Sequence, residues 1–219
     1  GKIAVASGPV MASADEFYIT IKGKGSHAAQ PHTGYDPILA ASNLVQHYQS
    51  MMTKSRDPLK PGVLSVTSIH GGSANNIFPD EVEIKGTMRA FDEQWRRELH
   101  NLFERHTREI CSLYGCSSEI NLVKGYPAVV NDQIAALLTA EAGKEIFGEE
   151  FILEFIPKMW GEDFAFYAQR VPSAFFFTGV LPRHEHEMAT LHNSSLNPDE
   201  EAMIYGTTML AASAMKYLS

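Results

Sequence analysis

Apolar and polar residues alternate with a period of two in four stretches of the first 125 residues. The stretches cover residues 16–22, 63–69, 81–91 and 117–123, and each is predicted to form a β-strand. Two longer stretches between them follow the helical period. The resulting order, β-α-β-β-α-β, is the split βαβ pattern of a ferredoxin-like α+β unit, here expected over residues 14–126.

Both helices of this unit carry an acidic residue at the predicted N-cap. Asp36, followed by Pro37, opens the first helix, and Asp92 opens the second. The apolar stripe of the first helix is predicted to contain Ile38, Ala41, Leu44, Val45, Tyr48, Met51 and Met52. The stripe of the second is predicted to contain Trp95, Leu99, Leu102, Phe103, His106, Ile110 and Leu113.

Residues 1–13 and 127–219 show a different organisation. Helices are predicted over residues 131–147, over 161–170 and from Pro198 to Tyr217, with one strand over 172–179. Helices around so few strands cannot cover a sheet by themselves. We therefore expect the fold class to be α/β: residues 1–13 and 127–219 form an incomplete α/β domain, into which the unit of residues 14–126 is inserted.

Composition narrows the possible functions. The chain has 219 residues, is 44% hydrophobic and has a net charge of −8, so it can form a sizeable core and lacks the basic stripe of a nucleic-acid binder. Arg96-Arg97, flanked by Glu93 and Glu98, is predicted to be a solvated helix face. A ferredoxin-like RNA binder would need basic charge and exposed aromatic residues on its sheet.

The cysteines and the apolar runs indicate where the protein resides. Cys111 and Cys116 are too few for a disulfide framework, and we interpret them as reduced core thiols. No run approaches the roughly 18 apolar residues of a membrane helix, and the N-terminus does not resemble a signal peptide. A cytoplasmic protein that binds no membrane is expected.

The loop after the first strand is the strongest candidate for chemistry. It reads Gly23-Lys24-Gly25-Ser26-His27-Ala28-Ala29-Gln30-Pro31-His32. Small residues let the backbone approach a ligand closely, and His27 can stabilise an oxyanion or hold substrate. Packing of His27 within the loop is the alternative, and His32 is expected either to fix the loop or to contact substrate.

Three further positions combine polar chemistry with loops or strand ends. Asn76, after Gly71-Gly72, can point its amide at a substrate or serve a turn. Arg89 lies in an amphipathic strand, where its guanidinium suits a carboxylate, although an exposed strand arginine is the alternative. Glu162, next to Asp163, either contacts substrate or lies at a helix start, where the dipole favours acids.

Two histidine-containing segments come late in the chain. The loop Arg183-His184-Glu185-His186-Glu187 is interpreted as solvated, because it is irregular and highly charged. His192, in Leu191-His192-Asn193, is a candidate metal ligand, although one histidine never makes a metal site by itself.

Taken together, these residues resemble the M20 amidohydrolases and carboxypeptidases, particularly the N-acyl-amino-acid amidohydrolases, hippurate hydrolases and auxin-conjugate hydrolases. The motifs that carry the resemblance occur in the family's order along the whole chain. They are Gly8-Pro9-Val10-Met11-Ala12, residues 23–32, Asp36-Pro37-Ile38, Gly71-Gly72, residues 76–80, Gly86-Thr87-Met88-Arg89, Gly161-Glu162-Asp163-Phe164 and Leu191-His192-Asn193.

The resemblance implies hydrolysis of N-acyl amino acids by an enzyme with two divalent metal ions, such as Zn, Mn, Co or Ni. It also implies a homodimer formed through the inserted lid domain. His27 matches a lid histidine that steadies the tetrahedral intermediate, often in the partner's site. Asn76 and Arg89 match positions that contact the substrate's carboxylate side, and His192 matches a metal ligand.

The family's remaining metal ligands and its general-base glutamate lie in a region that precedes the inserted domain. No segment of this chain matches that region, so the resemblance implies that the chain corresponds to the second half of a family member. We expect these 219 residues alone to be inactive. The alternative is a non-catalytic dimerisation module.

Overall fold

The structure is a computed structural model that describes residues 1–182, 184–185 and 187–219. The chain divides into two compact units. The central unit comprises Met11–Ala128 and Met159–Glu162, and the outer unit comprises Gly1–Val10, Val129–Lys158 and Asp163–Ser219.

The central unit contains an antiparallel four-stranded sheet. Its strands are β3 (Asp15–Lys22), β5 (Gly62–His70), β7 (Glu81–Ala90) and β8 (Ser117–Lys124). Their order in the sheet is β5-β7-β3-β8, so β5 and β8 are the edges. Burial alternates along β3, as the period-two pattern predicted.

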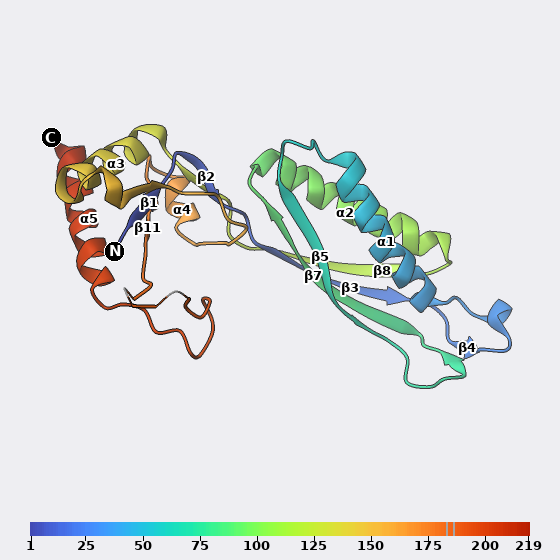
Figure 1. The fold of residues 1–219 in the computed structure, drawn as a ribbon. Coiled ribbons are helices and arrows are strands. Elements are labelled where there is room, and N and C mark those ends of the chain that lie inside the picture. Colours follow the sequence, from blue (N-terminus) through green and yellow to red (C-terminus); the bar gives the residue numbers. More distant parts are fainter. Residues whose placement is uncertain (183, 186) are drawn as a thin grey trace. The chain divides into compact units, whose positions relative to one another are not determined.

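Helices α1 (Pro37–Ser55) and α2 (Glu93–Leu113) lie on one face of this sheet (Figure 1). Both begin where the sequence predicted. The Asp36 carboxylate accepts hydrogen bonds from the backbone N–H groups of Ile38 and Leu39, at 2.8 and 3.2 Å. The carboxylate of Asp92 accepts one from the N–H of Trp95 at 2.6 Å.

Aromatic rings form the centre of the core between helices and sheet. The rings of Phe17 on β3 and Phe103 on α2 lie 4.7 Å apart, and Phe103 stacks on Tyr48 of α1 at 5.2 Å. The Tyr48 hydroxyl reaches the Thr107 hydroxyl at 2.6 Å, which satisfies a buried polar group. Burial raises the pKa of Tyr48 above its ordinary value.

The prediction of a solvated face at Arg96 is wrong. Arg96 is 7% exposed, and its guanidinium binds the carboxylate of Asp15 at 2.6 and 2.9 Å. The same carboxylate contacts Nε2 of His100 at 2.8 Å and accepts the N–H of Gly125 at 3.1 Å. A carboxylate buried at the start of β3 needs such partners, which draws α2's charged residues inward.

The inward face of α2 therefore differs from the predicted apolar stripe. Arg96, His100 and Thr107 are buried, whereas Leu113 is 74% exposed. On α1, Ile38 is 45% exposed although it was predicted to be buried. The polar contacts of Arg96 and His100 therefore act together with the buried apolar residues Trp95, Leu99 and Phe103 in orienting α2.

The outer unit is a second mixed arrangement of helices and strands. Its strand β1 (Ile3–Val5) pairs with β10 in parallel and with β11 antiparallel. The other elements are β2 (Gly8–Met11, whose last residue belongs to the central unit), β9 (Val129–Asn131), α3 (Gln133–Phe147), η2 (Glu149–Phe151), β10 (Ile152–Glu154), α4 (Ala165–Ala168), β11 (Phe177–Thr178) and α5 (Ala202–Leu218).

Two predicted elements of the outer unit are much shorter than expected. The helix predicted over residues 161–170 is only α4, and the strand predicted over 172–179 is only β11. Strand β1, in a segment where no strand was predicted, is the middle strand of the three-stranded sheet. In the described part of the chain, no helix is long and apolar enough to span a membrane.

Candidate functional site

The His27 loop is held by a short two-stranded ladder. Strand β4 (Ser26–His27) pairs antiparallel with β6 (Ile77–Phe78), so that His27 lies opposite Ile77. The N–H of Ala28 donates to the carbonyl of Asn76 at 2.9 Å. The structure thus brings together His27 and Asn76, two candidates that the sequence separates widely; β4 lies beyond one end of the four-stranded sheet (Figure 1).

The base of the loop is pinned by close backbone contacts. The N–H groups of Gly23 and Gly25 donate to the carbonyl and carboxylate oxygens of Asp80, both at 2.8 Å. Lys24 and Tyr35 exchange two backbone hydrogen bonds. A Cβ on Gly23 would lie 2.3 Å from the Tyr35 carbonyl oxygen, so only glycine fits there.

Replacing Gly23 by alanine is expected to destabilise the central unit by about 1–3 kcal/mol, because the new methyl group overlaps backbone that cannot move aside. Urea denaturation followed by tryptophan fluorescence tests this, since Trp95 and Trp160 both belong to the central unit. Gly206→Ala in α5 is the control, because its nearest atom, Thr178 Oγ1, is 3.5 Å away; since α5 belongs to the outer unit, circular dichroism of the whole chain follows its unfolding. Equal stability of both variants would contradict the close packing at Gly23.

The hydrogen bonding of His27 fixes its tautomer. The side chain is exposed, and its Nδ1 accepts the N–H of Ala29 at 3.1 Å. When Nδ1 is an acceptor, the neutral ring carries its proton on Nε2. His27 therefore presents an N–H donor to its surroundings, and His32 lies in the next turn, η1 (Pro31–Thr33), also exposed.

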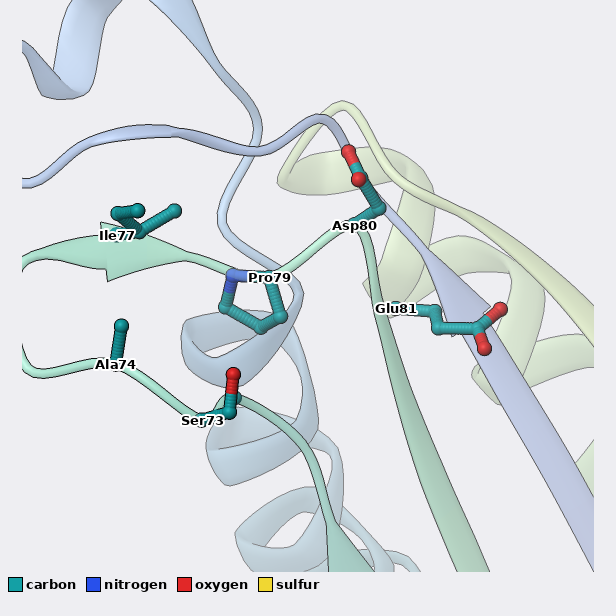
Figure 2. A pocket seen from close by; sticks show the side chains of 7 residues that line it. Ser73, Ala74, Ile77, Pro79, Asp80 and Glu81 are labelled. Carbon is teal, nitrogen blue, oxygen red and sulfur yellow. The ribbon is translucent and has the colours of Figure 1, made fainter.

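A shallow hollow of about 380 Å³ adjoins β6 (Figure 2). Ala74, Ile77 and Pro79 line it with apolar groups, whereas the carboxylates of Asp80 and Glu81 at its border point away from these three residues (Figure 2). Apolar groups with two negative charges nearby make this hollow poorly suited to a substrate carboxylate.

Arg89 has different neighbours. It is half-buried on β7, in register with Val63 of β5. A Cβ on Gly161 would lie 2.7 Å from the Ala14 Cβ and 3.6 Å from Nη1 of Arg89. The segment that carries Glu162 therefore passes directly beside the Arg89 guanidinium.

The candidates of the central unit consequently form two groups. His27 and Asn76 lie beyond the end of β7 that begins with Glu81. Arg89 and the segment that carries Glu162 lie at the opposite end of this strand. Strand β7 covers about 26 Å from Glu81 to Arg89 at about 3.3 Å per residue. No single small molecule can contact both groups within one copy of the central unit.

His192 belongs to the outer unit. Its side chain is exposed, and its backbone φ of 67° lies in the left-handed region, which is uncommon for a residue other than glycine. Among the described residues, no group of three or more His, Cys, Asp or Glu side chains is arranged to hold a metal ion. Of the loop at 183–187, Arg183 and His186 lie outside the described residues.

Sequence reasoning did not single out Asp80 as the residue that anchors the His27 loop. Asp80 fixes both Gly23 and Gly25 although 55 residues separate it from Gly25. The available signal was its position between Pro79 and the start of a strand, where an acidic side chain commonly accepts backbone N–H groups.

The fold and this arrangement define a two-unit α/β protein whose central unit presents a pinned histidine loop. Residues 13–114 match the family model of the peptidase dimerisation domain, M20_dimer. The chain belongs to the M20 family of metallopeptidases and amidohydrolases.

Relatives from bacteria and plants match nearly the whole chain. N-acetyl-L-cysteine deacetylase of Bacillus subtilis is 34% identical, over 100% of this chain and 51% of its own. IAA-amino acid hydrolase ILR1-like 4 of Arabidopsis thaliana is 33% identical, over 100% and 50%. The Bacillus subtilis YXEP protein, described as a dinuclear metal binding peptidase from the M20 family, has a TM-score of 0.76 at 27% identity, over 97% and 52%. This chain thus spans about half the length of these relatives.

Proposed function

We propose that this chain forms the lid domain and the C-terminal part of the catalytic domain of a metal-dependent hydrolase that cleaves the amide bond of N-acyl amino acids. The His27 ring carries the proposal, since a loop pinned at both ends presents it as an Nε2–H donor. The deacetylase and amino acid hydrolase activities named for the relatives support the substrate class.

The proposed roles follow from the chemistry of each side chain. The Nε2–H of His27 and the Asn76 amide donate hydrogen bonds to the oxygen that gains negative charge when the amide carbonyl is attacked. The Arg89 guanidinium binds the substrate carboxylate through two parallel hydrogen bonds. Glu162 and His32 border these two groups and help to shape the substrate site.

The metal centre of the proposed enzyme requires donors beyond those described here. His192 offers one imidazole, and the described residues gather no set of three donors. We propose that the other ligands and the general base come from residues outside this chain. Two divalent ions, of Zn, Mn, Co or Ni type, would polarise the carbonyl and activate water.

We further propose that the central unit is a ferredoxin-like lid and that a homodimer is built through it. The edge strand β5 presents unpaired backbone groups, and α1 lies beside it on the sheet (Figure 1). In such a dimer, His27 and Asn76 serve the partner's site while Arg89 serves the site of its own chain. This division agrees with the roughly 26 Å of β7 that separates the two groups.

Exposed apolar side chains of the outer unit support the proposal that a further segment completes the catalytic domain. Helix α5 buries only Ala202 and Met209, and five of its large apolar side chains are at least 64% exposed. They are Met203, Ile204, Leu210, Met215 and Leu218. Apolar side chains in such number on one helix favour a covering segment, which the additional half of the relatives would supply.

The proposal is tested with the purified 219-residue chain and with the gene. We expect no turnover of N-benzoylglycine or N-acetyl amino acids with added Zn²⁺, Mn²⁺, Co²⁺ or Ni²⁺. We also expect codons upstream of Gly1 to encode a His-x-Asp or Cys-x-His segment and a Glu-Glu pair. Metal-dependent turnover by the chain alone, or an upstream sequence without these residues, would overturn the proposed division of the metal centre.

The second candidate, a non-catalytic dimerisation module, is favoured by the match of residues 13–114 to a dimerisation domain. Joining the upstream segment distinguishes the two candidates. The hydrolase proposal requires the longer protein to turn over N-acyl amino acids, whereas a dimerisation module sediments as a dimer without turnover.

A further inference from the structure

The C-terminal end of α2 brings the two cysteines together. The N–H of Cys116 donates to the carbonyl of Cys111 at 2.9 Å, and the N–H of Gly115 donates to that of Ser112 at 3.0 Å. Gly115 has a φ of +70°. This pair of hydrogen bonds around a left-handed glycine is the Schellman motif, in which the side chains at the positions of Cys111 and Cys116 commonly touch.

The backbone hydrogen bond limits the distance between the two Cα atoms. A carbonyl oxygen lies about 2.4 Å from its own Cα, and a backbone nitrogen about 1.5 Å from its own. With the 2.9 Å hydrogen bond, the Cα atoms of Cys111 and Cys116 cannot be more than about 6.8 Å apart. Disulfides span Cα separations of about 4.4–6.8 Å, so the backbone is already in bridging range.

Both thiols are free, and they belong to the same apolar core. Cys111 is 0% exposed and Cys116 is 6% exposed, with its Sγ directed at the Tyr114 carbonyl. Burial raises the pKa of Cys111 to about 11 and also raises that of Cys116. The reduced pair is therefore slow to react, and Cys116 is the less completely buried of the two residues.

We propose that Cys111 and Cys116 are a redox modification site that closes to an intramolecular disulfide on exposure to a low-molecular-weight disulfide. Opening of the turn at residues 114–116 lets the Cys116 thiolate attack glutathione disulfide and expel one glutathione thiolate. The Cys111 thiolate then attacks the Cys116 sulfur and expels the second. Two electrons pass to glutathione, and the two thiol protons end on its two thiols.

This site adjoins the loop that carries His27. A Cβ on Gly115 would lie 2.4 Å from the Tyr35 ring, so that ring packs directly on the turn between the cysteines. Tyr35 in turn pairs with Lys24 at the base of the loop. Closing the disulfide stiffens the turn on which Tyr35 packs. Oxidation is therefore expected to reduce the motion of the His27 loop as well.

The test treats the folded chain with glutathione disulfide and follows its mass and its titratable thiols. We expect both thiols to be lost, with a mass lower by two hydrogen atoms, no retained glutathione and full reversal by dithiothreitol. Peptide mapping should place the bond between Cys111 and Cys116. Retained glutathione, a covalent dimer, or closure only in urea would overturn the proposal.

Single variants separate the two steps. Cys111→Ser is expected to leave a stable glutathione adduct on Cys116, whereas Cys116→Ser should leave the buried Cys111 unmodified. Hydrogen exchange at the amides of Lys24 and Tyr35 should slow after oxidation, while exchange in α3 stays unchanged. If hydrogen exchange at Lys24 and Tyr35 is unchanged by oxidation, the link between the disulfide and the His27 loop is refuted.

Discussion

Asp15→Ala is expected to destabilise the central unit by about 3–5 kcal/mol, because it leaves the buried Arg96 with only the half-buried Glu93 as counter-charge and removes the carboxylate that His100 contacts. Asp15 is 1% exposed. Its carboxylate binds the guanidinium of Arg96, contacts Nε2 of His100 and accepts a hydrogen bond from the N–H of Gly125. Urea denaturation monitored by tryptophan fluorescence measures the loss. A loss under about 1 kcal/mol would mean that the network does not hold the unit together.

The matched control is an ion pair on the surface of the same sheet. Lys22 and Glu119 join β3 to β8, but their side chains are 46% and 68% exposed. Solvent screens such a pair, so Glu119→Ala is expected to cost at most about 1 kcal/mol. The contrast isolates burial as the source of the Asp15 effect, since both carboxylates join elements of the same unit.

The Asp15 network also predicts a dependence of stability on pH. Burial alone would raise the pKa of Asp15, but hydrogen bonds and positive charge from Arg96 and His100 lower it from 3.8 to about 2. The folded state therefore binds this proton less tightly than the unfolded state. Its contribution of about 2 kcal/mol is complete well above pH 4 and is lost as the pH falls towards 2. The difference between wild type and Asp15→Ala should narrow over that range.

Local sequence signals located the central unit's elements well. The N-cap carboxylates of Asp36 and Asp92 act through hydrogen bonds within three residues, so sequence alone placed the starts of α1 and α2. The alternation of apolar and polar residues along β3 similarly predicted a strand with one buried face. These signals depend on neighbours in the chain, which the sequence displays directly.

The features that the sequence did not predict depend on partners that lie far away along the chain. Arg96 looked like a solvated residue because its partner, Asp15, lies 81 residues away. In the outer unit, β1 pairs with β10 near residue 152, and Asn131 is buried by hydrogen bonds to the carbonyls of Ala6 and Phe175. Short strands of this kind form because of distant partners, so their own residues carry little pattern.

The candidate site shows the same division. Sequence motifs selected His27, Asn76 and Arg89 one by one, and the resemblance to a family gave them roles. The pairing of β4 with β6 joins the first two, while the length of β7 separates them from Arg89. Only the fold reveals that the three residues cannot serve one site within a single chain.

In the complete metalloenzyme proposed above, His27→Ala is expected to lower kcat by about 10²–10³-fold, because one donor to the developing oxyanion is lost. Arg89→Ala is expected to act mainly on kcat/KM, since its guanidinium holds the substrate carboxylate before and during reaction. Arg89→Lys should recover little of this, because lysine lacks the two-pronged donor geometry. An Arg89→Ala enzyme with unchanged kcat/KM would remove Arg89 from the site.

Mixing these two variants tests the division of the site between subunits. In a mixed dimer of His27→Ala and Arg89→Ala chains, one site receives an intact Arg89 from its own chain and an intact His27 from the partner. Random reassociation makes half of the dimers mixed, so about a quarter of wild-type activity should return. If both residues served the same site from one chain, every site would lack one of them and no activity would return. A chain carrying both substitutions, mixed with either single variant, is the control and should stay inactive, because no site then receives both residues.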